Sequence, residues 1–248
     1  MRNIKLVKLV LEYDGTHFLG FQKQKRGRTV QREIERALFK ILRERVHVIP
    51  ASRTDSGVHA RGQVVSFRTR KTIPLHNLQR ALNTYFPEDL AVREIKEADP
   101  DFHARFDARR KIYIYRLLRD PVNFPLSRLY ACHYTHPLDI AVMKKGAAFL
   151  VGKHDFRSFQ AHAGEKSSVR TLYRASVAEK KPFIIFTFEG DGFLYNMIRN
   201  VVGTLLLLGR GKITLEQFKK IVESRDRRLA GPTAPPQGLT LEKVIYGK

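Results

Sequence analysis

Residues 53–59 carry the side chains best suited to chemistry. They read Arg-Thr-Asp-Ser-Gly-Val-His and place the Asp55 carboxylate between a fixed cation, Arg53, and a glycine-containing turn. Loops that follow strands often present working side chains, and a carboxylate there can act as a nucleophile or as a base. An isolated Asp-Ser-Gly sequence is also an ordinary tight turn. Asp55 is therefore a candidate catalytic residue, with a purely structural turn as the alternative.

Histidine and cysteine give no pattern typical of a metal site. His59, His103 and His154 stand in or near distinctive segments, but no pair has the helical HExxH spacing. Cys132 is the only cysteine, which excludes an intramolecular disulfide and a thiolate-rich zinc site. We interpret the three histidines as hydrogen-bonded or exposed imidazoles. Because no clear nucleotide-binding glycine motif is present either, we expect no cofactor and no required metal.

The charge of the chain predicts a polyanionic partner. Its 46 Lys and Arg residues outnumber 24 Asp and Glu residues, which gives a net charge of +22. The basic residues are interleaved with hydrophobic segments, unlike those of a disordered basic tail. With 43% hydrophobic residues the 248-residue chain can also form a substantial core. A globular protein that binds nucleic acid fits both properties.

The spacing of apolar residues predicts alternating strands and helices. A long loop over 14–28 follows the first strand, and Thr29 is the expected N-cap of the first helix. We expect strands over 4–13, 46–49, 63–70, 90–95, 111–118, 174–178 and 183–189, and helices over 30–43, 75–85, 140–150, 194–208 and 215–223. This is an α+β protein, which we divide into two similar halves, 1–105 and 106–248, each with a mixed, mainly antiparallel sheet flanked by helices, around a central basic cleft.

Neither the first residues nor the apolar runs of the sequence indicate a membrane protein. The first residues alternate charged and aliphatic side chains, and the apolar run 205–208 is too short to span a bilayer. The single cysteine suits a reducing compartment. We expect a cytoplasmic protein with no membrane partner.

Residues 52–63 (SRTDSGVHARGQ) resemble the signature of the tRNA pseudouridine synthase A family, in which the Asp of this run is the catalytic nucleophile. Other segments resemble further family motifs in the expected order, so the resemblance covers nearly the whole chain. They are 13–16 (YDGT) with Phe18, Gly20, Gln22 and Gln24, then 102–106 (FHARF), 113–115 (YIY), 152–156 (GKHDF), 193–203 (FLYNMIRNVVG) and 234–239 (APPQGL). Phe21 and Ser52 depart from the family, which often has Trp and Gly there.

The resemblance implies a pseudouridine synthase fold and the isomerisation of uridine to pseudouridine at positions 38, 39 and 40 of the tRNA anticodon stem-loop by a homodimer. It assigns Asp55 as the catalytic residue, Tyr113 as the substrate contact and Arg199 as active-site support, because a neighbouring guanidinium lowers the pKa of a buried carboxylate. Arg53 is then a contact to phosphate or to the displaced nucleotide. Spacing alone does not separate Tyr113 from Tyr115, which lies on the same strand face, or either one from a core residue.

The reaction breaks the N1–C1′ glycosidic bond and rejoins uracil through C5, so it needs no redox carrier. The target base must leave its stack, and aromatic side chains can compensate for the lost stacking. Loop 14–28, with Phe18, Phe21, Gln22 and several cations, is the candidate arm that touches the RNA. Two alternatives remain: a non-catalytic RNA-binding or RNA-folding protein, which would not need Asp55, and a metal-dependent nuclease, which would need clustered carboxylates.

Overall fold

The computed structural model describes residues 4–161 and 167–247. The chain forms two compact units. The first contains the described residues up to Arg109 together with those from Leu241 onward, and the second contains Arg110–Thr240. The final segment of the chain therefore belongs to the unit that the first segment builds.

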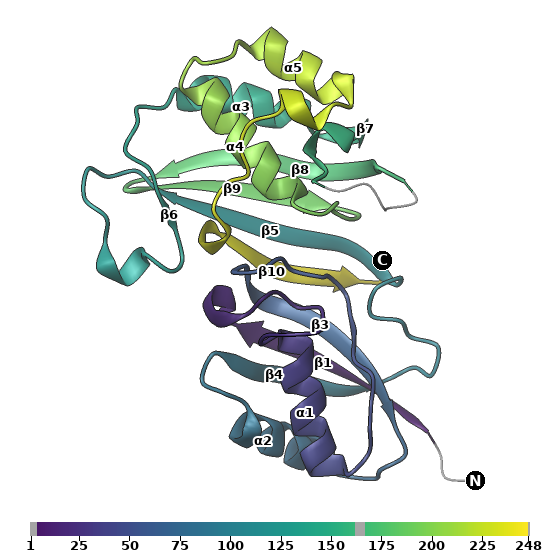
Figure 1. Cartoon of the computed structure of the whole chain (residues 1–248). Helices are drawn as coiled ribbons and strands as arrows, with labels where there is room; N and C mark the ends of the chain where they lie inside the picture. Colours follow the sequence, from purple (N-terminus) through teal and green to yellow (C-terminus); the bar gives the residue numbers. More distant parts are fainter. Residues whose placement is uncertain (1–3, 162–166, 248) are drawn as a thin grey trace. The chain divides into compact units, whose positions relative to one another are not determined.

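In the first unit, strands run in the order β4-β1-β3-β10, with the short β2 beside β3. Strand β1 pairs antiparallel with both β3 and β4, and helices α1 and α2 lie beside these strands (Figure 1). The elements are β1 (Lys5–Tyr13), α1 (Val30–Leu42), β2 (Ile49–Pro50), β3 (His59–Thr69), α2 (Leu75–Tyr85), β4 (Leu90–Ala98) and β10 (Leu239–Tyr246), with a 3₁₀ turn, η1, at Gly15–His17.

The second unit has the strand order β5-β9-β8-β7, and β6 pairs parallel with β5 in an otherwise antiparallel set of pairs. Helices α3, α4 and α5 pack together beside strands β8 and β9 (Figure 1). The elements are β5 (Ala108–Leu118), β6 (Cys132–His133), α3 (Ile140–Phe149), β7 (Gly152–Asp155), β8 (Val169–Lys180), β9 (Phe183–Gly190), α4 (Met197–Gly209) and α5 (Leu215–Ser224), with 3₁₀ turns η2 (Pro125–Ser127), η3 (Arg157–Phe159), η4 (Arg227–Leu229) and η5 (Pro236–Gly238).

The mixed, mainly antiparallel α+β class is confirmed, and the helix predictions agree closely with the structure. Helix α1 begins at Val30 because the Thr29 side chain accepts a hydrogen bond from the Arg32 amide, as a preferred N-cap residue does. Helix α2 has the expected bounds. Helix α4 begins three residues later than expected, since Asn196 adopts a left-handed conformation with φ of 58°. This late start places Arg199 in the first turn of α4.

Strand bounds differ more from the expectations. Strand β3 begins at His59 instead of residue 63, because its first residues already pair with β1, with Ala60 opposite Tyr13. The strand expected over 46–49 is instead the short β2, Ile49–Pro50, beside β3. Strands β6, β7 and β10 were not expected; β6 and β7 pair with the neighbouring strands β5 and β8, and only β10 pairs with a strand far away in the sequence, β3. The early start of β3 leaves residues 51–58 as a short loop between two paired strands, β2 and β3.

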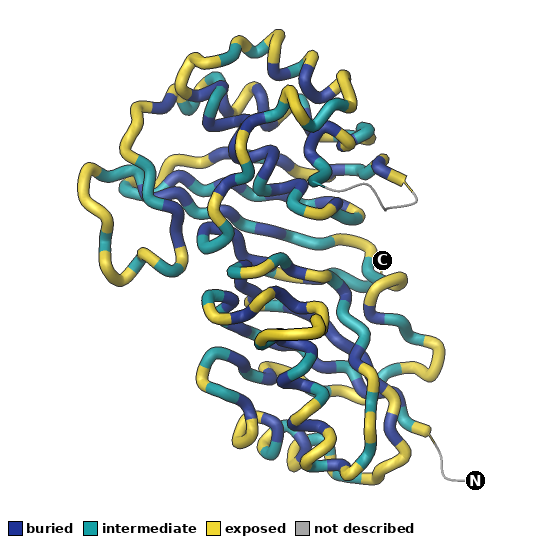
Figure 2. The backbone as a smooth tube through the Cα atoms, viewed as in Figure 1, coloured by how far each residue is buried: buried dark blue, intermediate teal, exposed yellow. Residues whose placement is uncertain are grey.

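Burial follows the layers of each unit. Along β1 the inward residues Leu9, Leu11 and Tyr13 are at most 3% exposed, and they alternate with less buried neighbours. Figure 2 shows the same contrast between largely buried strands and exposed connecting loops in each unit. Within the described ranges, no helix combines the length and the apolar character needed to cross a bilayer.

Candidate active-site residues

Asp55 lies on a tight turn between β2 and β3. The Val58 amide donates a 3.2 Å hydrogen bond to the Asp55 carbonyl, and Gly57 has φ of 75°, a conformation that favours glycine. Asp55 is partly exposed, whereas Thr54 before it is buried and Arg53 is exposed. The turn thus holds a carboxylate at the surface of the unit and leaves the Arg53 cation toward solvent.

Loop 14–28 braces this turn from one side. The Phe21 amide donates to the Thr54 carbonyl at 3.0 Å, and the Gly57 amide donates to the Phe18 carbonyl at 3.2 Å. Gly20, with φ of 88°, passes so close that a Cβ there would lie 2.9 Å from the Thr54 carbonyl oxygen. A glycine is required at this crossing for both steric and conformational reasons.

The two phenylalanine rings of loop 14–28 are buried, so any contact of this loop with RNA must come from its other side chains. Phe18 is 1% exposed and Phe21 is 0% exposed. Tyr13 packs edge-on against Phe18 at a ring distance of 6.3 Å, and the Arg28 guanidinium lies 4.2 Å from the centre of the same ring. The rings fill the core beneath the Asp55 turn because burying aromatic surface there stabilises the fold more than exposure would.

A buried polar network supports the Asp55 turn from the sheet side. The Tyr13 hydroxyl and Thr54 Oγ1 are 2.7 Å apart, and Gln63 Nε2 lies 3.3 Å from the Tyr13 hydroxyl. Gln63 also pairs with the main chain of Ser52, donating to its carbonyl at 2.7 Å and accepting from its amide at 3.2 Å. Burial raises the pKa of Tyr13 to about 12, so its phenol stays protonated at neutral pH. The sequence predicted no role for Tyr13, Thr54 or Gln63; the available signal was the polar side chains at inward positions of β1 and β3.

His59 connects the other end of the turn to loop 14–28. Its Nδ1 atom lies 3.0 Å from the Gly15 amide nitrogen and 3.1 Å from Asp14 Oδ1. A single ring nitrogen cannot accept from the amide and donate to the carboxylate at once. The Gly15 amide can only donate, so we assign the neutral tautomer with its proton on Nε2. The buried imidazole is therefore a structural acceptor, as the sequence interpretation of this histidine expects.

Tyr113 lies on β5 in the second unit. It pairs with Phe188 of β9 and is 5% exposed, and the Phe193 ring packs edge-on against it at 5.2 Å. Tyr115, two residues along, is fully buried and donates to the Pro235 carbonyl at 3.0 Å. The structure thus distinguishes the two tyrosines: Tyr115 anchors the segment before β10, and Tyr113 meets a neighbour, Phe193, that is itself only partly buried.

Arg199 is held by main-chain and side-chain oxygens. Its Nε donates to the Ala234 carbonyl at 2.7 Å and its Nη1 donates to Asn196 Oδ1 at 3.0 Å, while the Ala234 amide returns a bond to the Arg199 carbonyl at 3.1 Å. Asn200, next along α4, is fully buried and donates to the Phe159 carbonyl at 2.7 Å. Asn196, just before α4, and Ala234 therefore fix the direction of the partly buried Arg199 guanidinium.

His103 and His154, the other two histidines of the distinctive segments, form hydrogen bonds with main-chain groups close to them in the sequence. His103 Nδ1 lies 3.1 Å from the Arg105 amide and 3.2 Å from the Phe106 amide, and His154 Nε2 lies 3.3 Å from the Val151 carbonyl. Over residues 4–161 and 167–247, no group of three or more His, Cys, Asp or Glu side chains is arranged to hold a metal ion.

Comparison with known proteins identifies the family. The family model described as tRNA pseudouridine synthase matches residues 9–107 and 147–247, which include Asp55 and Arg199. A protein of Thermoanaerobacter sp. (strain X514) named tRNA pseudouridine synthase A is 46% identical over 247 residues, 99% of this chain and 100% of that protein. Proteins of the same name from Acetivibrio thermocellus and Clostridium acetobutylicum are 45% and 44% identical, over 99% and 98% of this chain and all of each relative. The chain described here belongs to the tRNA pseudouridine synthase family.

Proposed function

We propose that this protein isomerises uridine to pseudouridine at positions 38, 39 and 40 in the anticodon stem-loop of tRNA, with Asp55 as the catalytic carboxylate. The observation that carries the proposal is the placement of Asp55 on a partly exposed turn that two independent sets of contacts brace, inside the region that the family model matches. A rigid turn keeps the carboxylate in one position relative to a bound nucleotide. The net charge of +22 supports binding to a polyanion such as tRNA.

The other predicted residues have proposed roles that suit their chemistry. Arg199 is the proposed active-site support, since a guanidinium favours the ionised form of a carboxylate that it contacts. Tyr113 contacts the substrate through its ring, and the exposed Arg53 binds phosphate or the displaced nucleotide. The reaction breaks the N1–C1′ bond, turns the detached uracil and forms a C5–C1′ bond, with the C5 proton lost to solvent. The proton lost from C5 is matched by one gained at N1, so uridine and pseudouridine are isomers and the reaction needs no oxidant or reductant.

Tritium release tests the function directly. A tRNA transcript labelled with tritium at uracil C5 loses that tritium when pseudouridine forms, and its chain stays intact. We expect release by the native protein in the presence of EDTA, and none by Asp55→Ala, which should still bind tRNA. A matched transcript with cytidine at positions 38–40 should release nothing.

Each alternative gives a different result in the same assay. Binding without release from either transcript would identify a non-catalytic RNA-binding protein. Metal-dependent cleavage of the transcript would identify a nuclease. Release by Asp55→Ala at the native rate would remove Asp55 from the mechanism.

We also propose that the enzyme is a cytoplasmic homodimer, and a monomeric mass in light scattering would contradict the dimer.

A further inference from the structure

Residues 23–28, here called the basic arm, carry four cations in six positions (KQKRGR). The arm is exposed from Lys23 through Gly27. The Lys25 and Arg26 side chains make no ion pair or hydrogen bond with other described residues, whereas Lys23 lies 3.3 Å from a Glu35 oxygen and Arg28 makes a bidentate pair with Asp89 at 2.6 and 2.7 Å. Two of the four cations are therefore available to an external anion.

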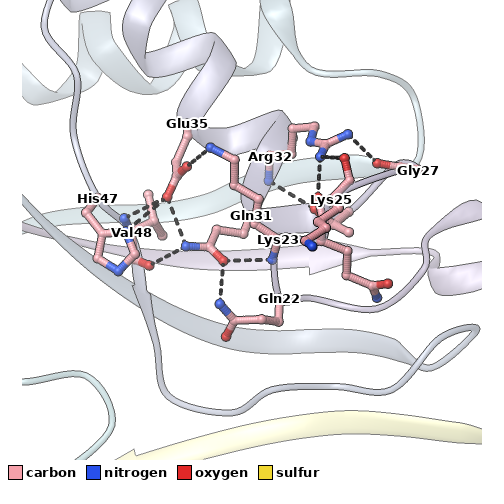
Figure 3. A network of polar contacts seen from close by, with 11 residues as sticks. Gln22, Lys23, Lys25, Gly27, Gln31, Arg32, Glu35, His47 and Val48 are labelled. Atoms are coloured by element: carbon pink, nitrogen blue, oxygen red, sulfur yellow. Dashed lines mark hydrogen bonds and ion pairs between the residues drawn. The ribbon is translucent and has the colours of Figure 1, made fainter.

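The shape of the arm is set by Arg32 in the first turn of α1. Its guanidinium donates to the Gly27 carbonyl at 2.6 Å and to the carbonyls of Gln24 and Lys25 (Figure 3). A cation that satisfies several carbonyls of one loop holds that loop in a single conformation. These three carbonyl oxygens face Arg32. Its positive charge therefore compensates their partial negative charge, which would otherwise repel an anion.

The start of the arm is fixed by Gln31, also on α1. Its Oε1 accepts from the Lys23 amide at 2.9 Å and from Gln22 Nε2 at 3.2 Å, and its Nε2 donates to Glu35 at 2.9 Å and to the Val48 carbonyl at 3.3 Å (Figure 3). Gln31 is 2% exposed, so these bonds are shielded from water. The network ties the arm to the segment that enters β2 and the Asp55 turn.

Phe21 links the basic arm to the Asp55 turn. The Phe21 amide donates to the Thr54 carbonyl at 3.0 Å, while the Phe21 carbonyl accepts from the Gln31 amide at 3.0 Å. Phe21 is therefore held between the residue before Asp55 and the residue that fixes the arm. An anion that binds to the arm is positioned relative to Asp55 by contacts within one compact unit.

We propose that the basic arm is a preformed binding site for backbone phosphates of the RNA substrate, with Lys25 and Arg26 as the phosphate ligands and Arg32 and Gln31 as positioning residues. The proposal rests on the proposed function in taking tRNA as the polyanion. Phosphates bind more strongly to cations that have no competing acidic side chain nearby. A preorganised loop also binds phosphates with less loss of conformational entropy. Phe18 and Phe21 have no direct contact with the phosphates in this proposal, because their rings are buried and only support the loop that carries the arm.

The salt dependence of binding tests the ligand assignment. In Lys25→Ala/Arg26→Ala, the slope of log Kd against log salt for unmodified tRNA should fall by about 1 to 2, and affinity at moderate salt should drop about tenfold or more. Lys144→Ala/Lys145→Ala on the exposed side of α3 removes the same charge and should leave the slope within error of native. An unchanged slope in the arm variant, or an equal loss in the α3 variant, would overturn the site.

Arg32→Met tests preorganisation separately. It keeps Lys25 and Arg26 but removes the donors to the arm carbonyls, so tRNA affinity should fall while the salt slope stays close to native. An unchanged affinity would show that the clamp has no role in binding. A slope reduced by about 1 would make Arg32 itself a phosphate ligand and would contradict its role as a positioning residue.

Measuring these slopes in the Asp55→Ala background separates the arm from the enzymatic proposal. If the native protein releases no tritium but the arm slopes change as expected, only the enzymatic function fails. If tritium is released and the slopes do not change, only the arm proposal fails. Tritium release and the salt slopes therefore test the two proposals independently.

Discussion

The carboxamide of Gln63 forms two hydrogen bonds with the main chain of Ser52, accepting from its amide at 3.2 Å and donating to its carbonyl at 2.7 Å. The side chain thus replaces the main-chain hydrogen bonds that a paired strand would form with Ser52. Ser52 lies where the chain leaves the sheet to form the Asp55 turn. Ala51, one residue earlier, still pairs with the Val64 main chain at 2.8 Å. The brace prolongs the sheet by one residue and leaves the turn short.

We expect Gln63→Met to lower both stability and turnover. The substitution keeps the volume but removes both hydrogen bonds between Gln63 and the Ser52 main chain, at a cost of about 1 to 3 kcal/mol in the free energy of unfolding. In tritium-release kinetics kcat should fall at least tenfold with KM little changed. Gln79→Met is the matched control, because Gln79 also binds main-chain carbonyls, of Val92 and Arg93, between α2 and β4. Equal losses of kcat in both variants would contradict a local effect on Asp55.

The Tyr13 phenol should make stability fall in alkaline solution. Its pKa is raised from 10.0 to about 12 by burial, so the unfolded phenol ionises before the folded one. Its contribution to stability is complete below pH 10 and is lost as the pH rises to about 12, by up to about 3 kcal/mol. Urea unfolding across this window should show a smaller decline for Tyr13→Phe than for the native protein. Parallel declines in the two proteins would exclude Tyr13 as a source.

Gly20→Ala should impair catalysis beyond its cost in backbone strain. Both Gly20 and Gly211 have positive φ, 88° and 67°, so alanine at either position costs about 1 kcal/mol for the left-handed conformation. Only at Gly20 would the new Cβ also meet the Thr54 carbonyl at 2.9 Å; at Gly211 no described atom lies within 4 Å. We therefore expect a loss of tritium release in Gly20→Ala and native activity in Gly211→Ala. Full activity in the Gly20 variant would mean that loop 14–28 does not position Asp55.

Arg199→Leu should change the pH dependence of the reaction. If Arg199 supports the catalytic carboxylate as proposed, its removal makes the ionised form less favourable, and the acid limb of the pH–rate profile moves to higher pH. The rate should fall most at low pH and recover partly as the pH rises. Arg227→Leu, which removes a guanidinium donor to Asn200 in the same unit, controls for loss of packing. A uniform loss of rate at every pH would assign Arg199 a structural role.

Local patterns in the sequence determined the helices and the reactive segment. Helix α1 follows from apolar spacing and its Thr29 cap, and α2 from Leu75 to Tyr85 follows from apolar spacing alone; both signals act within a few residues. The Asp55 segment was identifiable because a carboxylate, a cation and a turn glycine stand within five residues. Family resemblance added the roles proposed for Tyr113, Arg199 and Arg53, which spacing could not assign.

Only the tertiary structure decided what depends on partners distant in the chain. Strand β10 joins the first unit because β3, far earlier in the sequence, offers it an edge, and no local signal specifies that partner. Because Phe18 and Phe21 stand in a polar loop, the sequence suggested that they belong to an exposed arm. Their rings are instead buried in the core beneath the Asp55 turn. The Gln63 brace spans 11 residues and forms only once β3 is paired. Spacing along the chain determines helices and turns, whereas burial and strand pairing are settled by the packing of the whole unit.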